Sequence, residues 1–371
     1  MASDASAAEA VREQSPVAVR PYAPSWLDTL VRWIERLPGP TSAWYVPISV
    51  AAGAFIVLES ALSSRGLFGQ DPTYFGYAFF HVYPLAAYHF LSSGARGAVE
   101  AFRPATDAGD ATVERWRLEL STTPARPALV LCVVGAANYL LMLAAAPQGW
   151  DLVGHQPAFV VLRVVSEGLW LTPVALMAVY LLVRQVRIVA KLHRSVVRVD
   201  LLEPGPIHAM STLTARGALV AVVLQLAIVL SPLPNLSEGV RLAQAAIMVP
   251  FLALSVAAFF VPLRGMQALL AAEKSRRLSE VNARLDAALA TLHDVVDEES
   301  VPTRDADAAR HSQTRIDALN KALSSLLQER DFISKRSTLP WDTGTFRAVA
   351  SAVILPIVLF LVTRALERFG V

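Results

Sequence analysis

The sequence predicts an all-α polytopic membrane protein with seven transmembrane helices, and three observations lead to this fold class. Hydrophobic residues make up 54% of the 371 residues and charged residues only 17%, and the mean hydropathy is +0.45, unlike an ordinary soluble domain. Apolar segments of about 20 residues, long enough to cross a bilayer, recur along the chain. Lysine and arginine are concentrated in every second connection between these segments, as the positive-inside rule predicts.

The chain begins with a polar, alanine-rich stretch, residues 1–23, which has no basic region followed by an apolar core and is therefore expected to be a disordered cytoplasmic tail rather than a secretory signal. Residues 24–37 have helical periodicity. The apolar side consists of Trp26, Leu27, Leu30, Trp33, Ile34 and Leu37, and the polar side of Asp28, Arg32, Glu35 and Arg36. This segment is too short and too charged to span, so we expect an interfacial amphipathic helix.

Six predicted spans occupy residues 43–263. They lie at about 43–62, 74–91, 127–146, 158–183, 215–230 and 242–262. Helical spacing continues beyond two of them, to about residue 102 after the second and past residue 183 after the fourth. We therefore expect both of these helices to extend beyond the bilayer.

A charged insert follows at residues 264–340, and it has two series of apolar residues at intervals of three and four. The first series is Leu278, Val281, Leu285, Ala288, Leu292 and Val295, and the second is Ile316, Leu319, Leu323 and Leu326. An acidic stretch containing Pro302 separates them. The pattern predicts a cytoplasmic helical hairpin; a self-associating coiled coil is the alternative.

The last region, residues 341–371, contains the seventh predicted span at 343–363. The sequence Leu339-Pro340-Trp341-Asp342 should interrupt the helix at the membrane surface. Asp342 or Thr343 can then cap the final helix by accepting backbone N–H groups.

The orientation follows from the distribution of basic residues. Of the 33 lysines and arginines, 27 lie in the N-terminal region, residues 94–126, residues 184–216 and the insert. Only four lie in the connections on the other side or at the C-terminal end, and Arg163 and Arg347 fall inside spans. We therefore expect a cytoplasmic N-terminus, an external C-terminus and a multi-pass location in the plasma (inner) membrane.

Polar residues at membrane depth are functional candidates because burying them in lipid is costly. Arg163 and Glu167 are four residues apart on the fourth span and share one helix face. Counting residues from the outer end of each span places several polar side chains in the outer half of the membrane. The ligand-pocket candidates are Tyr77, His81, Asn138, Tyr139, Arg163 and Glu167. A structural ion pair is the alternative for Arg163 and Glu167, and a packing seam is the alternative for the tyrosines and histidine of the second span.

Several kinds of chemistry find no support in the sequence. A net charge of +2 does not indicate nucleic-acid binding. His81 and His89 are two turns apart with no cysteine or carboxylate at ligand spacing, so no metal site is expected. Protease, hydrolase, Walker and Rossmann motifs are missing. We expect no enzyme activity and no cofactor; an intramembrane enzyme without a known motif is the alternative.

The order of these elements resembles the insect odorant and gustatory receptor-like seven-helix channels. The matching features are the helix at 24–37, the extension after the fourth span, the hairpin, and the break before the last span at 343–363. The family's Thr-Tyr and Gln-Phe signature in the last helix is not present, since Thr345-Phe346 has no following glutamine. The similarity is therefore one of architecture, and the pore chemistry of the family does not carry over.

The resemblance implies a homotetrameric, ligand-gated cation channel whose subunits associate through residues 264–363. Ligand binding in the outer half would shift the last helix and open a central pore. The pore-lining candidates are Ser351, Ile354, Leu355, Val358 and Val362. The alternative is a noncatalytic sensor or scaffold that presents the hairpin to a partner. A secondary transporter would need internal repeats, which the seven unequal spans do not show.

Overall fold

The structure, a computed structural model, describes residues 21–63, 76–145, 157–196, 205–230, 238–299, 306–341 and 343–369. These residues form helices joined by turns, with one isolated antiparallel bridge between Pro24 and Pro124. The all-α class predicted from the sequence is confirmed for this part of the chain. Residues 1–20 lie outside the described residues, as do Tyr74 and Asp342.

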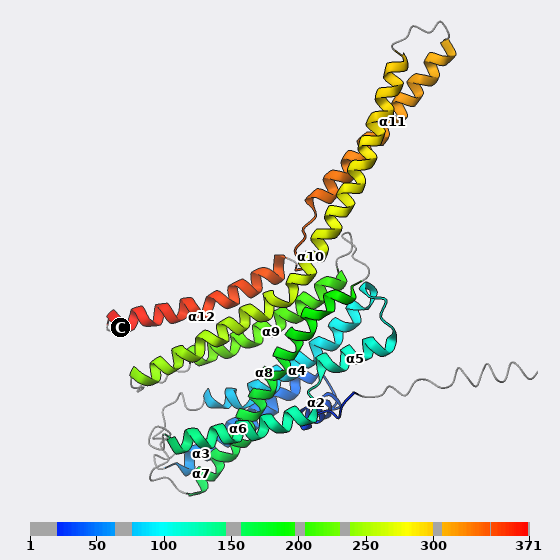
Figure 1. Cartoon of the computed structure of the whole chain (residues 1–371). Helices are drawn as coiled ribbons and strands as arrows, with labels where there is room; N and C mark the ends of the chain where they lie inside the picture. The colour runs from blue at the N-terminus through cyan, green and yellow to red at the C-terminus, as the bar shows by residue number, and fades with distance from the viewer. Residues whose placement is uncertain are drawn as a thin grey trace, which may run out of the picture.

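Most of the helices form a bundle, in which α4 packs against α3, α5, α8 and α9 (Figure 1). The bundle helices are α2 (Trp26–Glu35), α3 (Tyr45–Leu62), α4 (Tyr77–Phe102), α5 (Asp110–Ser121), α6 (Ala125–Ala145), α7 (Pro157–Arg163), α8 (Thr172–Leu192) and α9 (Gly205–Leu230). Three short 3-10 turns accompany them, η1 (Thr41–Trp44), η4 (Arg103–Ala105) and η6 (His193–Ser195), and the segment η5 (Val164–Leu171) is π-helical. The predicted helical continuations along the chain are present, because α4 runs to Phe102 and α8 to Leu192; their position relative to a bilayer remains a prediction.

Four helical stretches of the described residues are long and apolar enough to cross a membrane. They are Thr41–Leu62, Pro157–Leu192, Gly205–Leu226 and Leu252–Asp297. Two shorter apolar helices lie at Ala125–Leu141 and Thr343–Leu359. A membrane protein is therefore indicated, whereas the count of seven spans and their orientation remain predictions.

The N-terminal helix α2 packs into the bundle, and its pattern of burial differs from the predicted one. Leu27, Val31 and Ile34 are at most 2% exposed and join the core formed by α4, α8 and α9. Trp26 and Trp33, predicted on the apolar side, are 42% and 58% exposed. The prediction that Asp28 lies on the exposed polar side is wrong, because its carboxylate is buried among hydrogen-bond donors.

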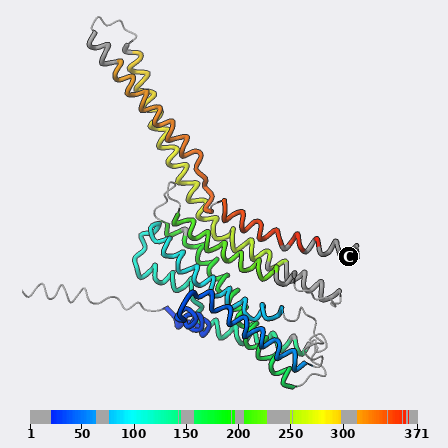
Figure 2. Tube along the Cα trace, turned by 180° about the vertical axis from the view of Figure 1, so that it is seen from behind, coloured from blue at the N-terminus to red at the C-terminus, as the bar shows by residue number. Residues whose placement is uncertain are grey.

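The longest helix, α10 (Glu238–Glu299), has 62 residues and is continuous through Pro250 and Pro262. At about 1.5 Å per residue it is about 93 Å long. Its second half pairs with α11 (Ala306–Lys335) in a hairpin that projects away from the bundle (Figures 1 and 2). The two predicted apolar series meet in the interior of this hairpin, where Val281, Leu285, Leu323 and Ile333 form a buried cluster.

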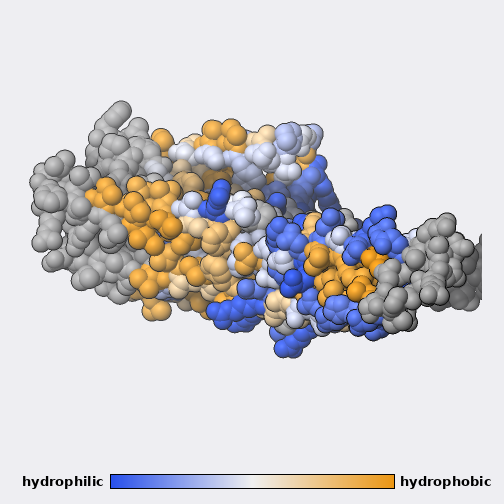
Figure 3. Space-filling model, turned by 90° about the horizontal axis from the view of Figure 1, so that it is seen from above, coloured by the Kyte–Doolittle hydropathy of each residue, from blue (hydrophilic) through white to orange (hydrophobic). Residues whose placement is uncertain are grey.

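The last helix, α12 (Thr343–Phe369), begins after a non-helical segment that follows Lys335. The predicted break before the last span is thus present. The helix turns away from the hairpin and packs mainly against α9 at the edge of the bundle (Figure 1). In Figure 3 a broad hydrophobic surface gives way along the molecule to a mostly hydrophilic one, as expected where a membrane-embedded region meets water.

Candidate functional site

The described part of the bundle contains a buried cluster of charged side chains from α3, α7 and η5. The Arg163 guanidinium lies 2.9 Å from Glu167 Oε1 and 3.3 Å from Glu59 Oε1. All three side chains are at most 10% exposed. Because an isolated buried charge is very costly, these contacts are what makes burial of the three groups tolerable.

A π-helical segment positions Glu167 in this cluster. Across η5 the backbone N–H of Thr172 donates to the Glu167 carbonyl, five residues earlier, and the Thr172 hydroxyl donates to the same oxygen at 2.8 Å. Pro173 follows and has no N–H to continue an α-helical ladder, which favours the wider turn. Such π segments often occur at functional sites.

His81 on α4 faces this cluster in a defined tautomer. Its Nδ1 lies 2.9 Å from the Tyr77 carbonyl oxygen. A carbonyl only accepts, so Nδ1 carries a hydrogen. The other ring nitrogen, Nε2, is buried and has no hydrogen-bond partner among the described residues. His81 is close enough to Glu167 to interact with it electrostatically.

Two aromatic residues lie next to the ion cluster. The Tyr77 ring centroid lies 6.0 Å from Arg163 Cζ, within cation–π range. Tyr139 is buried, and its side chain interacts electrostatically with both Arg163 and Glu167. Its ring approaches η5 so closely that a Cβ at Gly168 would lie 2.9 Å from Tyr139 Cδ1. Glycine is therefore needed for this close approach.

Five of the six predicted ligand-pocket residues come together here, namely Tyr77, His81, Tyr139, Arg163 and Glu167. Asn138 is exposed, whereas its neighbour Tyr139 is buried. Consecutive helical residues are rotated by about 100°, so equal depth did not imply a shared face. Glu59 was not among the predicted site residues. It lies three residues from the end of the first predicted span, where a carboxylate is expected to face the membrane–water interface.

A second polar network ties α2 to the rest of the bundle. Asp28 Oδ1 accepts from the Tyr88 hydroxyl at 2.6 Å, and Oδ2 accepts from the backbone N–H groups of Ser25 and Thr123 at 2.9 and 3.1 Å. Asp28 is also the N3 residue of a capping box with Ser25. This carboxylate therefore joins α2, α4 and the α5–α6 turn.

Nearby polar contacts strengthen the same junction. The Gln185 side-chain amide donates to the carbonyls of Leu91 and Leu120 at 3.1 and 2.8 Å. Arg184 donates to the Tyr22 hydroxyl at 3.0 Å. Burial raises the pKa of Tyr22, so its hydroxyl keeps the proton that it donates to the Leu118 carbonyl.

The predicted pore-lining residues lie on the surface of a single chain. Ser351 is exposed. Ile354, Leu355, Val358 and Val362 are 46–55% exposed. On the opposite side of α12, Val349 is 8% exposed and packs with Ala218 of α9 and Phe259 of α10. The helix therefore has one packed face and one open face.

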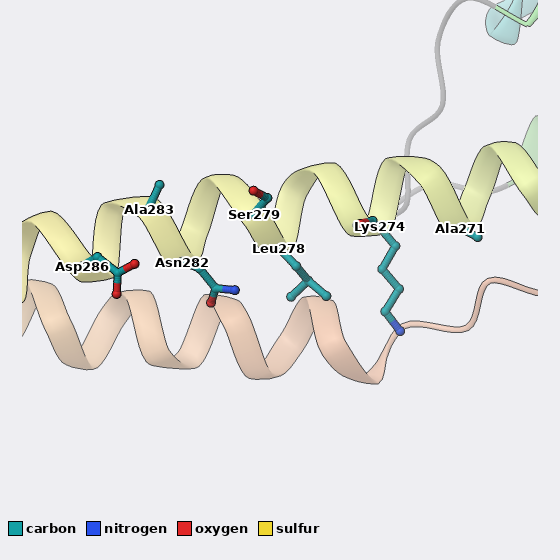
Figure 4. Close-up of a pocket in the computed structure, with 8 residues that line it drawn as sticks. Ala271, Lys274, Leu278, Ser279, Asn282, Ala283 and Asp286 are labelled. Carbon is teal, nitrogen blue, oxygen red and sulfur yellow. The ribbon is translucent and has the colours of Figure 1, made fainter.

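The base of the hairpin is held by Lys274. Its ammonium donates to the carbonyl oxygens of Ser334 and Arg336 at 2.6 and 2.7 Å, where α11 ends. In Figure 4 the α10 side chains turned toward α11 are Lys274, Leu278, Asn282 and Asp286. A cation at a helix C-terminus is favoured by the helix dipole and satisfies carbonyls that lack intrahelical partners. This contact fixes the point from which the chain continues to α12.

No protein-family model matches this chain, and no curated protein or solved structure matches it. The features of the molecule that bear on its function are the ion cluster, the open face of α12 and the hairpin.

Proposed function

We propose that the chain is a subunit of a homo-oligomeric, ligand-gated cation channel in the plasma (inner) membrane, with seven spans, a cytoplasmic N-terminus and a pore lined by α12. The observation that carries this proposal is the two-sided character of α12. One face packs against α9 through Val349, and the other leaves Ile354, Leu355 and Val358 without contacts that bury them. The open face is what a helix facing a symmetry axis would present.

The composition of the open face supports a pore rather than a purely lipid-facing surface. Arg347 and Ser351 are exposed on the same side of the helix as Leu355, Val358 and Val362. An arginine at a lipid-facing position is costly. Arg347 and Ser351 would then line the cytoplasmic entrance of the pore, and the apolar residues that follow them would form a hydrophobic gate.

The connection between α12 and the hairpin supports gating. The non-helical segment after Lys335 separates α12 from α11. Lys274 holds the end of α11 against α10, so α12 can tilt about this point while the hairpin stays in place. In this proposal the hairpin joins the subunits, and a ligand acting near Tyr77, His81, Tyr139, Arg163 and Glu167 biases the position of α12.

Single-cysteine variants recorded in planar bilayers test the pore. The chain has one cysteine, so Cys132→Ser provides a cysteine-free background. A water-soluble thiol reagent should block current in Ser351→Cys and Val358→Cys, because only a water-exposed thiol ionises and reacts. Val349→Cys on the packed face is the control. Purified protein that passes no current with any candidate ligand and stays monomeric by mass measurement would contradict the proposal.

The second candidate function is a noncatalytic sensor or scaffold that presents the hairpin to a partner. It is favoured by the hairpin having its own hydrophobic interior around Val281, Leu285 and Leu323 and projecting clear of the bundle (Figure 1). It predicts that a soluble fragment of residues 264–340 is helical by circular dichroism and binds a partner alone. The channel proposal instead predicts a fragment that is unstable without the spans.

A further inference from the structure

We infer that Arg347 is the charge filter of the pore, and that it makes the channel pass monovalent cations in preference to divalent ones. This inference rests on the proposed function, because it assigns an ion selectivity to the same pore. The residue lies near the beginning of α12, in the part of the open face that is closest to the hairpin.

The first argument is the position of Arg347 on the helix. Residues four, seven and eleven positions later in an α-helix lie on nearly the same side. Counted from Arg347, these residues are Ser351, Ile354 and Val358, and all four side chains are exposed. Val349 lies on the opposite side and is packed against α9 and α10. A pore lined by the open face therefore includes one Arg347 from every subunit.

The second argument is that no acidic residue shares the helix face with this arginine. Between Thr343 and Val362, Arg347 is the only charged residue. The nearest carboxylate in the sequence is that of Asp342, which precedes α12. The fixed charge that α12 contributes to the pore is thus the positive guanidinium.

The helices against which α12 packs do not supply an acidic side chain at this level either. In α9 the only charged residue is Arg216, whose Cζ lies 5.0 Å from the ring centroid of Phe90 on α4. In α10 the only charged residue between Leu242 and Ala272 is Arg264, which is exposed. The positive charge of Arg347 is therefore not offset by carboxylates of these helices.

A ring of positive charges acts more strongly on divalent than on monovalent cations, because the energy of an ion in an electrostatic potential is proportional to its charge. A potential of about one kT per elementary charge lowers the local concentration of a monovalent cation about threefold and that of a divalent cation about sevenfold. Monovalent cations still enter such a pore, whereas divalent cations are depleted at its cytoplasmic entrance.

Currents of the full-length protein in planar bilayers test this inference. In the Cys132→Ser background, Arg347→Cys removes the charge, and thiol reagents of similar size then attach either a trimethylammonium or a sulfonate group. We expect the ratio of calcium to sodium permeability, obtained from reversal potentials, to rise about threefold in Arg347→Cys. The cationic group should return it toward the native value, and the sulfonate should raise it further. Arg126→Cys, at an exposed residue near the start of α6, is the control.

Both reagents modify the same folded protein, so a difference between them does not arise from misfolding. An equal ratio of calcium to sodium permeability with the two attached groups would overturn the inference and leave the proposed channel intact. An equal response of the Arg126→Cys control would also overturn it, because the effect would then not belong to the pore entrance. Native protein that passes no current, or that prefers chloride to sodium, would contradict the proposed cation channel and this inference together.

Discussion

The Tyr88 hydroxyl donates a 2.6 Å hydrogen bond to Asp28, a residue 60 positions earlier in the chain. Both side chains are at most 3% exposed. Because Asp28 also caps α2, this bond helps to attach the N-terminal helix to α4, together with the ion pairs that Glu35 makes with His89 and Arg96. The amphipathic segment therefore acts as a structural part of the bundle.

Replacing Tyr88 by phenylalanine should reduce the free energy of unfolding by about 1.5–3 kcal/mol, the usual range for a hydrogen bond to a charged group. The loss arises because Asp28 Oδ1 is left buried without the Tyr88 donor. Thermal unfolding in detergent micelles measures it. Tyr180→Phe is the matched control, since the half-buried Tyr180 hydroxyl makes no hydrogen bond within the described residues. Equal stability of the two variants would argue against this role for Asp28.

Removal of the cluster's only guanidinium should be more severe. Arg163→Met leaves Glu59 and Glu167 buried without their cation, which typically costs about 3–5 kcal/mol. The triple variant Arg163→Met/Glu59→Gln/Glu167→Gln removes all three charges and should recover much of this loss. Unfolding of both variants in the same detergent provides the comparison. A single variant as stable as the native protein would contradict this role for Arg163.

Close packing of α6 against α8 depends on Gly135. A Cβ at this position would lie 3.1 Å from the Pro173 backbone nitrogen and 3.3 Å from Pro173 Cα, and backbone atoms cannot move aside cheaply. Gly135→Ala should therefore lower stability by about 1–3 kcal/mol. Gly53→Ala meets no atom within 4 Å and should be neutral or stabilise α3 by up to about 1 kcal/mol. The opposite order in melting temperature would show that the two helices adjust freely.

Loss of the Lys274 ammonium should loosen the end of α11. Lys274→Met removes both donors to the Ser334 and Arg336 carbonyls, at a cost of about 0.3–1 kcal/mol. Hydrogen exchange should become faster at the amides of the last turn of α11 and of residues 336–339. Lys321→Met is the control, because Lys321 is exposed in the middle of α11 and lies away from the helix end. Identical exchange in the two variants would exclude Lys274 as the fixed point of this joint.

Local periodicity accounts for the parts of the fold that the sequence predicted well. The heptad series from Leu278 and from Ile316 predicted the hairpin, because a helix needs a partner for a continuous apolar stripe. Leu339 and Pro340 predicted the interruption before α12, since proline disfavours helix in the residue before it. Both signals are contained within a few turns of the chain.

The partial success at the ion cluster has a different cause. Arg163 and Glu167 were paired correctly because a spacing of four residues places them on one face of any helix. Depth alone suggested Asn138, but the rotation of α6 turns that residue outward and directs Tyr139 inward. Glu59 could not be assigned, because its contact with Arg163 spans 104 residues and depends on how α3 packs against α7.

The sequence by itself determined the helical class, the membrane character, the hairpin and the break before α12, all of which follow from composition and from spacing within single helices. Only the tertiary structure decided which faces meet. In the structure Asp28 is buried beside Tyr88, Glu59 contacts Arg163, and one face of α12 is exposed. The physical reason is that a helix presents several faces to its surroundings, and the choice among them is made by close packing between segments far apart in the chain.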